Sequence, residues 1–337
     1  MAIRVGILGC GMWAGMHATR FNEMGDEVDV VGLCDLNTDI TQAFADRHFA
    51  GTRHKPAQFD DPRKMYDEAN LDCVFIVTPH ALHYEHACQA IAADLNILVE
   101  KPMVTNIKDG YALREKVKQS NRAFIIGYNS PCTPALNLLR KMIVDQRFGK
   151  LQMVIGYLTQ NWMRGTTGTW RQQAEISGGG QAYDSGAHLL CSLVWSVASS
   201  PRTVSATIEP FTAPVDVNSV FNIRFENDVL ASIAINGNCQ VMSADMSFIF
   251  DSGRVRVDPW FGTRIQAQDK DGSIDLADEL SGETVTPTRH ILDVIRGEAE
   301  PTTSPDNGVH QSELMDAIYE SAKLGRTVSL SEVIGNN

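Results

Sequence analysis

Asp184 and His188 are the two side chains in this sequence best suited to move a proton. They lie four residues apart, so on a helix both would project from one face and bear on the same substrate. The glycines at positions 178–180 would let the backbone come close to a ligand. In the competing interpretation, Asp184 is an acid at a helix N-terminus and His188 is an ordinary core histidine. The pattern therefore predicts an acid–base site beside a helix.

A glycine turn near the N-terminus has the spacing of a dinucleotide-binding site. The residues GCGMWA at positions 9–14 follow a strand-like run and open a helical one, so helix amides can hold a pyrophosphate. Asp35 ends the second predicted strand, where a carboxylate can bind ribose hydroxyls and repel a 2′-phosphate. Alternatively, the glycines only make a turn and Asp35 only caps the next helix. We expect NAD as cofactor, with these binding residues: Gly9, Gly11, Met12, Trp13 and Asp35.

Three nearby histidines raise the question of a metal site. They are His80, His83 and His86, and their spacing fits no zinc-protease pattern. They follow a predicted strand at the edge where cofactors bind in parallel sheets. We therefore predict no metal, and expect Thr78, Pro79, His80 and His83 to line the cofactor site, with Thr78 and Pro79 beside the ribose and His86 on a helix surface.

The first part of the chain alternates strand and helix patterns, which predicts a doubly wound parallel sheet in residues 1–126. The predicted strands are Arg4–Leu8, Val28–Cys34, Cys73–Val77, Asn96–Val99 and Ala123–Ile126. The predicted helices are Trp13–Met24, Thr38–His48, Leu82–Ala93 and Lys108–Ser120. Such α/β units carry their ligands at the carboxyl ends of the strands.

The second part, residues 127–337, has a different pattern after a helix expected at Ala135–Val144. Strands follow one another without helices, which predicts an α/β domain with an open, mainly antiparallel sheet. The predicted strands are Leu151–Leu158, Thr203–Ile208, Ser219–Phe225 and Val229–Ile235, and helices return at Pro287–Arg296 and Val309–Leu324. One face of such a sheet can pack on a partner, so a homodimer or homotetramer is expected.

Composition narrows the class of protein. The 337 residues carry a net charge of -12, which disfavours nucleic acid and anionic membrane as partners. We find no apolar run long enough to span a bilayer. The seven cysteines are scattered and include no CxxC pair, which favours a reducing, cytoplasmic location.

Taken in order, the motifs GxGxxA, TPxxxH, EKP and GGxxxDxxxH resemble those of the glucose-fructose oxidoreductase and inositol dehydrogenase (Gfo/Idh/MocA) family over essentially the whole chain. This resemblance implies a Rossmann domain, a second α/β domain and catalysis in the cleft between them. It implies that Lys101, Asp184 and His188 surround the reacting carbon, and that Glu100, Lys101 and Pro102 contribute to the cofactor site.

One segment departs from the family pattern. Where many members carry GFxxRF, this chain has GYNSPC, so Pro131 and Cys132 replace the Arg-Phe pair and the substrate cannot be assigned by analogy. Asn129 in this segment is expected to reach the nicotinamide or substrate. A loop over the cleft is expected at residues 162–171, with Trp170 against a sugar face and Arg171 holding a polar group; alternatively, the tryptophans only pack and the arginines are solvated.

The predicted activity is hydride transfer between NAD and a hydroxyl-bearing carbon of a sugar, polyol or glycoside. His188 is assigned as general base because histidine has an unperturbed pKa of about 6.5. Lys101 would stabilise developing alkoxide, and Asp184 would orient the substrate or His188. A rival assignment makes Lys101 the base, which requires a depressed pKa. Two other functions stay open: an NAD-assisted glycosidase or lyase without net redox change, and a non-catalytic NAD-binding regulator.

Overall fold

The computed structural model describes residues 2–336, which fold into two compact units. The first unit takes the chain up to Val104, Tyr111–Gly127 and Pro287–Pro305, and the second takes Thr105–Gly110, Tyr128–Thr286 and the chain from Asp306 onward. The contiguous division expected after residue 126 thus differs from these units at Gly127 and at two short segments, 105–110 and 287–305.

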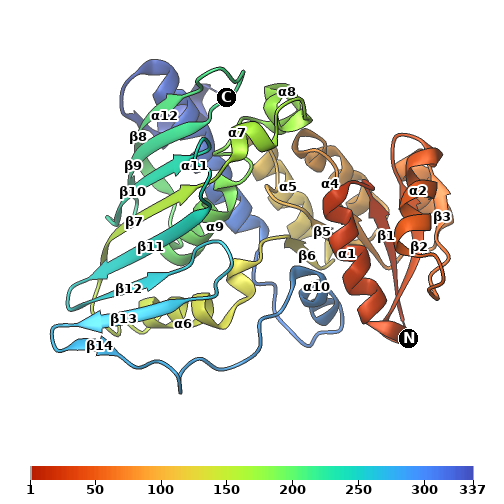
Figure 1. Cartoon of the computed structure of the whole chain (residues 1–337), viewed down its shortest axis with the longest axis horizontal. Coiled ribbons are helices and arrows are strands. Elements are labelled where there is room, and N and C mark those ends of the chain that lie inside the picture. Colours follow the sequence, from red (N-terminus) through yellow and green to blue (C-terminus); the bar gives the residue numbers. More distant parts are fainter. Residues whose placement is uncertain (1, 337) are drawn as a thin grey trace. The chain divides into compact units, whose positions relative to one another are not determined.

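A six-stranded parallel sheet forms the centre of the first unit, in the order β3-β2-β1-β4-β5-β6 (Figure 1). The strands are β1 (Ile3–Leu8), β2 (Val28–Cys34), β3 (Ala57–Phe59), β4 (Cys73–Ile76), β5 (Asn96–Val99) and β6 (Phe124–Ile126). Every residue of β4 is buried, as expected for a central strand covered on both faces. The predicted doubly wound sheet is confirmed, and its order reverses at β1, which places a ligand site at the carboxyl ends of β1 and β4.

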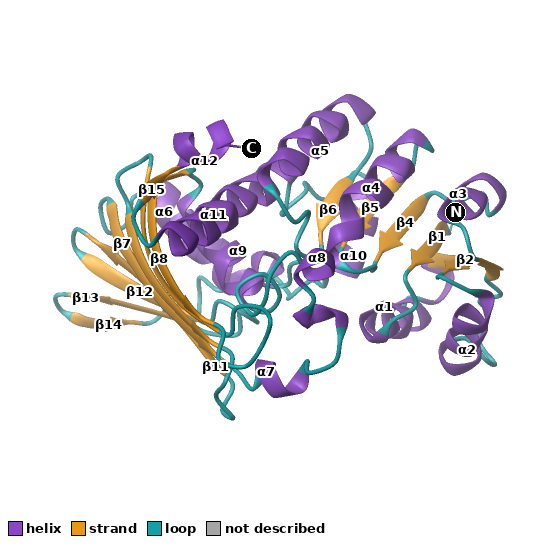
Figure 2. Ribbon diagram, turned by 90° about the horizontal axis from the view of Figure 1, so that it is seen from above, coloured by secondary structure: helices purple, strands orange, loops and turns teal. Residues whose placement is uncertain are grey.

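Helices cover both faces of this sheet (Figure 2). One layer holds α1 (Met12–Glu23), α2 (Thr38–His48) and α10 (Pro287–Ile295), and the other holds α3 (Pro62–Glu68), α4 (His83–Ala92) and α5 (Ile107–Ser120). Ile291 and Leu292 of α10 join the core formed by Phe21, Phe75 and Ile125. The short elements β3 and α3 are absent from the sequence prediction, because a strand of three residues shows no clear alternation.

The second unit has a nine-stranded sheet in the order β14-β13-β12-β11-β7-β10-β9-β8-β15. Its strands are β7 (Leu151–Thr159), β8 (Pro201–Glu209), β9 (Asn218–Phe225), β10 (Leu230–Asn236), β11 (Ser243–Phe250), β12 (Gly253–Val257), β13 (Ile265–Asp269), β14 (Gly272–Ile274) and β15 (Val328–Ser329). Neighbours pair antiparallel except β7 and β10, which are parallel. The expected open, mainly antiparallel sheet is confirmed.

Helices cover one face of the nine-stranded sheet (Figure 2). They include α6 (Pro134–Val144), α9 (Gly186–Val197), α11 (Pro305–Leu324) and α12 (Leu330–Asn336), and the short helices α7 (Trp162–Gly165) and α8 (Ala174–Ser177) lie in the segment before α9. Side chains alternate along β7, so Val154 and Leu158 enter the core while Met153, Ile155 and Tyr157 are exposed. None of the helices within residues 2–336 is long and apolar enough to cross a bilayer.

Candidate active site

The glycine turn after β1 has the geometry of a phosphate cradle. Gly9 has a φ of +93°, and a Cβ there would lie 2.8 Å from the backbone of Val77, so no other residue fits. Gly11 occupies the N-cap position of α1, and a Cβ there would meet nothing within 4 Å. The first amides of α1, including those of the exposed Met12 and of Trp13, therefore face open space at the positive end of the helix. This arrangement fits a dinucleotide pyrophosphate.

Asp35 stands beside this turn with its carboxylate already oriented. Oδ2 accepts a hydrogen bond of 2.7 Å from the backbone of Cys10, and Oδ1 accepts one of 2.7 Å from the backbone of Leu36. Each oxygen keeps a lone pair for another donor. The next side chain, Leu36, is 87% exposed and carries no charge. The residues present therefore fit the adenosine ribose of a nicotinamide dinucleotide.

The segment after β4 is held in place by hydrogen bonds of two histidines. His83 is buried and its Nδ1 and Nε2 lie 2.7 and 2.8 Å from the carbonyl oxygens of Pro102 and Thr78. Burial lowers the pKa of His83, and the two carbonyl partners oppose that shift. His86, expected as a surface residue, hydrogen-bonds the Thr78 hydroxyl at 3.0 Å, and burial lowers the pKa of His86 to about 4.

His80 and Pro79 belong to the same segment. The buried ring of His80 lies 5.9 Å from that of His83, and Pro79 precedes the short 3-10 helix His80–Leu82. Within the described part of the chain no three His, Cys, Asp or Glu side chains are grouped to hold a metal ion.

Glu100, at the end of β5, is a buried charge that ties three segments of the first unit together. Its Oε1 lies 3.0 Å from His17 Nε2 on α1, and its Oε2 accepts the backbone N–H of Lys101 at 3.3 Å. Trp13 adds a side-chain hydrogen bond. Burial alone would raise the pKa of Glu100, but the bond and charge of His17, with Lys101 and Trp13, outweigh it and hold that pKa below its ordinary value. Glu100 thus orients the Lys101–Pro102 segment, whose peptide bond is cis.

Sequence reasoning found Glu100 but not its partner His17, nor Thr288 on the other side of that ring. The His17 Nδ1 lies 2.9 Å from the hydroxyl of Thr288 on α10, which also accepts a bond from Arg20. A local signal was present, since Trp13 and His17 lie four residues apart on one face of α1. No local pattern indicated Thr288, which joins from 271 residues further along the chain. Gly127 leaves the room for this network, because a Cβ there would lie 2.6 Å from Glu100 Oε1.

In the second unit, Asp184 lies in the turn before α9 rather than on the helix itself. Its Oδ2 accepts a 2.8 Å hydrogen bond from the indole of Trp162 and lies 3.2 Å from Nε of Arg171. The Arg171 guanidinium also sits 4.6 Å from the ring centre of Trp170. The expected loop residues Trp170 and Arg171 are therefore brought to Asp184. Trp162, which is 2% exposed, is a core residue of this unit.

His188 lies in the first turn of α9 among aromatic rings. Its imidazole stacks on Trp260, with ring centres 4.3 Å apart and an interplanar angle of 29°. Tyr128 meets it edge-on at 6.0 Å, and the Tyr128 hydroxyl donates to Gln311 at 2.5 Å. Two sides of the ring are thus fixed by packing. Sequence analysis did not find Trp260 or Tyr128 as partners of His188, since aromatic residues carry no spacing signal for such a contact.

Asn129 and Lys101 complete the predicted set. Asn129 precedes a 3-10 helix formed by Ser130–Cys132, where the chain departs from the family pattern, and is half-buried. Lys101 is half-buried in the first unit, whereas Asp184 and His188 belong to the second. The structure thus groups the predicted cofactor residues of the first unit around one sheet edge, and groups Asp184 with Arg171 in the second.

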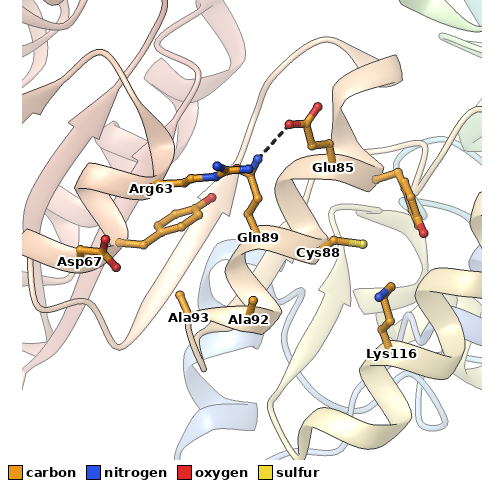
Figure 3. Close-up of a pocket in the computed structure, with 10 residues that line it drawn as sticks. Arg63, Asp67, Glu85, Cys88, Gln89, Ala92, Ala93 and Lys116 are labelled. Atoms are coloured by element: carbon orange, nitrogen blue, oxygen red, sulfur yellow. Dashed lines mark hydrogen bonds between the residues drawn. The ribbon is translucent and has the colours of Figure 1, made fainter.

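A separate hollow of about 580 Å³ lies among the helices of the first unit (Figure 3). It is lined from α3, α4 and α5, and its polar side chains include Arg63, Asp67, Glu85, Gln89 and Lys116. The lining mixes both signs of charge. It does not come from the carboxyl ends of the strands, where ligands of open parallel sheets bind. We therefore give this hollow no part in the chemistry below.

The chain is similar to known oxidoreductases over nearly its whole length. It is 23% identical to D-xylose 1-dehydrogenase [NADP(+)] of Haloarcula marismortui, covering 97% of this chain and 93% of that one. It is 22% identical to scyllo-inositol 2-dehydrogenase (NADP(+)) of Bacillus subtilis, covering 97% and 96%. A crystal structure of the WlbA dehydrogenase from Bordetella pertussis, with NADH and UDP-GlcNAcA, superposes with a TM-score of 0.83 at 23% identity, covering 98% and 99%.

Family models account for both parts of the chain. Residues 3–128 match the model described as oxidoreductase family, NAD-binding Rossmann fold, and residues 136–256 match the GFO/IDH/MocA C-terminal domain. The matches agree with the order of the motifs and with the two sheets. The chain belongs to the Gfo/Idh/MocA family of oxidoreductases.

Proposed function

We propose that this oxidoreductase transfers a hydride between NAD and a hydroxyl-bearing carbon of a sugar or polyol. The observation that carries the proposal is the pairing of the open α1 cradle at Gly11 with the oriented Asp35 carboxylate. The named activities of the relatives, on D-xylose and on scyllo-inositol, support the substrate class. Bound NAD would supply the acceptor for the hydride that leaves the carbinol carbon.

NAD rather than NADP is the proposed cofactor, although two relatives are named for NADP(+). Asp35 places a negative charge where a 2′-phosphate would lie, and Leu36 beside it offers no cation to offset that charge. A phosphate at this position would be repelled by the carboxylate.

His188 is the proposed general base. A neutral imidazole can take the hydroxyl proton. The stack on Trp260 fixes the plane of the His188 ring, so proton transfer requires no rotation of the side chain. Asp184 acts differently, since Arg171 and Trp162 already engage its carboxylate. We assign Asp184 and Arg171 as one polar pair that orients substrate hydroxyls.

Lys101 is assigned to donate a hydrogen bond to the reacting oxygen and stabilise its developing negative charge. Glu100 and its backbone bond to Lys101 hold this part of the chain in place. In the rival assignment Lys101 takes the proton itself. Comparison of His188→Ala with Lys101→Met separates the two, because only the variant that lacks the base loses the acidic limb of the pH–rate profile.

The test of the function is turnover of NAD with a panel of aldoses and inositols, followed by absorbance of the reduced nicotinamide. Stoichiometric accumulation of NADH is expected. Release of product without any net change in absorbance would contradict the proposal and favour an NAD-assisted hydrolase or lyase. Absence of NAD binding by titration would remove the proposal altogether.

A second copy of this chain is proposed to cover the exposed face of the nine-stranded sheet. Three large apolar side chains of β7 are exposed there, Met153, Ile155 and Tyr157. Light scattering at micromolar concentration should give at least a dimer, and Ile155→Lys should weaken it. The cysteines are free thiols, mostly buried, in keeping with the proposed cytoplasmic location.

A further inference from the structure

The glycines before Asp184 serve a contact within the protein. A Cβ at Gly179 would lie 2.0 Å from the hydroxyl of Tyr319, and one at Gly180 would lie 2.0 Å from the backbone oxygen of Asp216. Any larger residue would push this segment away from α11 and from the strand-entry loop at Asp216. The close approach expected at these glycines is therefore to Tyr319 and Asp216.

Asp216 is buried, with 5% of its surface exposed, and its carboxylate is fully engaged with this segment. Oδ1 accepts the backbone N–H of Gly180 at 2.6 Å and the hydroxyl of Tyr319 at 2.5 Å, and Oδ2 accepts the backbone N–H of Ala182 at 2.8 Å. The backbone oxygen of Asp216 accepts the N–H of Gln181 at 2.9 Å. Three of these bonds fix the three consecutive residues 180–182, and the fourth ties Asp216 to Tyr319.

The fixed residues connect directly to the proposed chemistry. The backbone N–H of Asp184 donates to the oxygen of Gly180 at 2.9 Å, and that of Gly186, the first residue of α9, donates to the oxygen of Gln181 at 2.7 Å. A displacement of Gly180 and Gln181 is therefore passed to Asp184 and to the helix turn that carries His188.

Resting on the proposed function, we propose that Asp216 and Tyr319 are positioning residues that set the placement of Asp184 and His188 for hydride transfer. Neither is assigned contact with substrate. Their effect is on the geometry of the reacting groups, where a shift of about 1 Å can cost about 100-fold in rate. Burial raises the pKa of Asp216 while the three donors oppose that shift, so the carboxylate depends on these bonds.

Tyr319→Phe removes the hydroxyl that donates to Asp216 and accepts the backbone N–H of Gly180 at 3.3 Å, and it keeps the ring that stacks on Tyr183. In the full chain with NAD we expect kcat to fall about tenfold for Tyr319→Phe and about 100-fold for Asp216→Asn, with the NAD dissociation constant unchanged. The control is Ser321→Ala on the same helix, which removes a buried hydroxyl bonded to Ala206 and Arg326. It should lower the melting temperature but leave kcat within about twofold.

A readout independent of turnover is the imidazole resonance of His188, assigned by comparison with His188→Asn. It should move in Tyr319→Phe and stay in place in Ser321→Ala. If Tyr319→Phe moves the resonance but the wild type turns over no substrate of the panel, the proposed function is refuted and the effect of Tyr319 on the placement of His188 stands. An active wild type whose kcat and resonance are both unaffected by Tyr319→Phe would overturn the positioning role. So would an equal loss of kcat in Ser321→Ala.

Discussion

In each unit one buried carboxylate holds a segment that we propose to act in catalysis. The groups that surround the two carboxylates differ. Glu100 in the first unit faces an imidazole, His17, and its pKa is held low. Asp216 in the second unit faces only neutral donors, two backbone amides and a phenol, and its pKa is raised. The first carboxylate is thus paired with an imidazole, and the second is held by backbone and phenol dipoles. The comparison predicts that substitutions around Glu100 in the first unit weaken NAD binding. Substitutions around Asp216 in the second unit should instead lower the rate of hydride transfer.

The largest effect should come from His188→Ala in the second unit. Loss of the general base should lower the hydride-transfer rate by about 10²- to 10⁴-fold, while the NAD dissociation constant stays nearly unchanged. Single-turnover absorbance and a cofactor titration measure the two quantities. Should His188→Ala keep near-normal turnover and its acidic limb while Lys101→Met is inactive, the base is Lys101.

His17→Ala should have the next largest effect, on stability in the first unit. It leaves the 6% exposed Glu100 without its imidazole partner, and breaking a buried pair in this way costs about 3 kcal/mol. Urea denaturation measures the loss, and NAD affinity should fall with it because α1 carries both His17 and the glycine cradle. The matched substitution His54→Ala, at a buried histidine of the same unit that hydrogen-bonds Val30, tests whether any buried imidazole gives this result. Equal losses of NAD affinity in His17→Ala and His54→Ala would contradict a specific role of the His17–Glu100 pair in the cofactor site.

Asp35→Ser tests the cofactor side alone. It should weaken NAD by about 1.5 to 3 kcal/mol per lost bond to the charged group and narrow the preference over NADP. Calorimetric titration of both oxidised cofactors measures this, with the rate of hydride transfer to saturating NAD as the control quantity. NADP binding as tightly as NAD in the wild type would contradict the assignment of Asp35.

The sequence predicted those elements of the fold that are determined by residues close together along the chain. The β2 strand Val28–Cys34 and the α2 helix Thr38–His48 have the predicted bounds, because apolar alternation and the Asn37 cap determine them within a few residues. The turn at Gly9 and the position of Asp35 were predicted for the same reason, because each follows directly from the strand before it.

The residues that sequence reasoning missed depend on contacts distant along the chain. His17 and Thr288 lie 271 residues apart, and Asp216 meets Gly180 across 36 residues. The stack of Trp260 on His188 likewise follows only from the folded chain. A single sequence gives composition and spacing, but it does not show which buried polar groups will meet. The proposed catalytic residues could therefore be predicted from the sequence, whereas the residues that position them could not.

The smallest predicted effect is the sharpest test of the comparison, because the two carboxylates should respond to pH with opposite signs. Glu100 has a folded-state pKa below its ordinary value of 4.5, so the unfolded chain binds its proton more readily. Its stabilising contribution is present above pH 4.5 and is lost as the pH falls through the folded pKa. Asp216 has a folded-state pKa above its ordinary value of 3.8, so its contribution is present below pH 3.8 and is lost as the pH rises through the folded pKa.

Unfolding free energies of the wild type, Glu100→Gln and Asp216→Asn, measured by urea between neutral pH and the acid limit of the folded state, isolate each group by difference. The slopes should differ from wild type by at most about 1.4 kcal/mol per pH unit, in opposite directions. Asp316, whose pKa burial raises to about 6, contributes equally to all three proteins and cancels. If both variants changed the slope in the same direction, the two carboxylates would be held alike, and the contrast between an imidazole partner and a set of dipoles would be wrong.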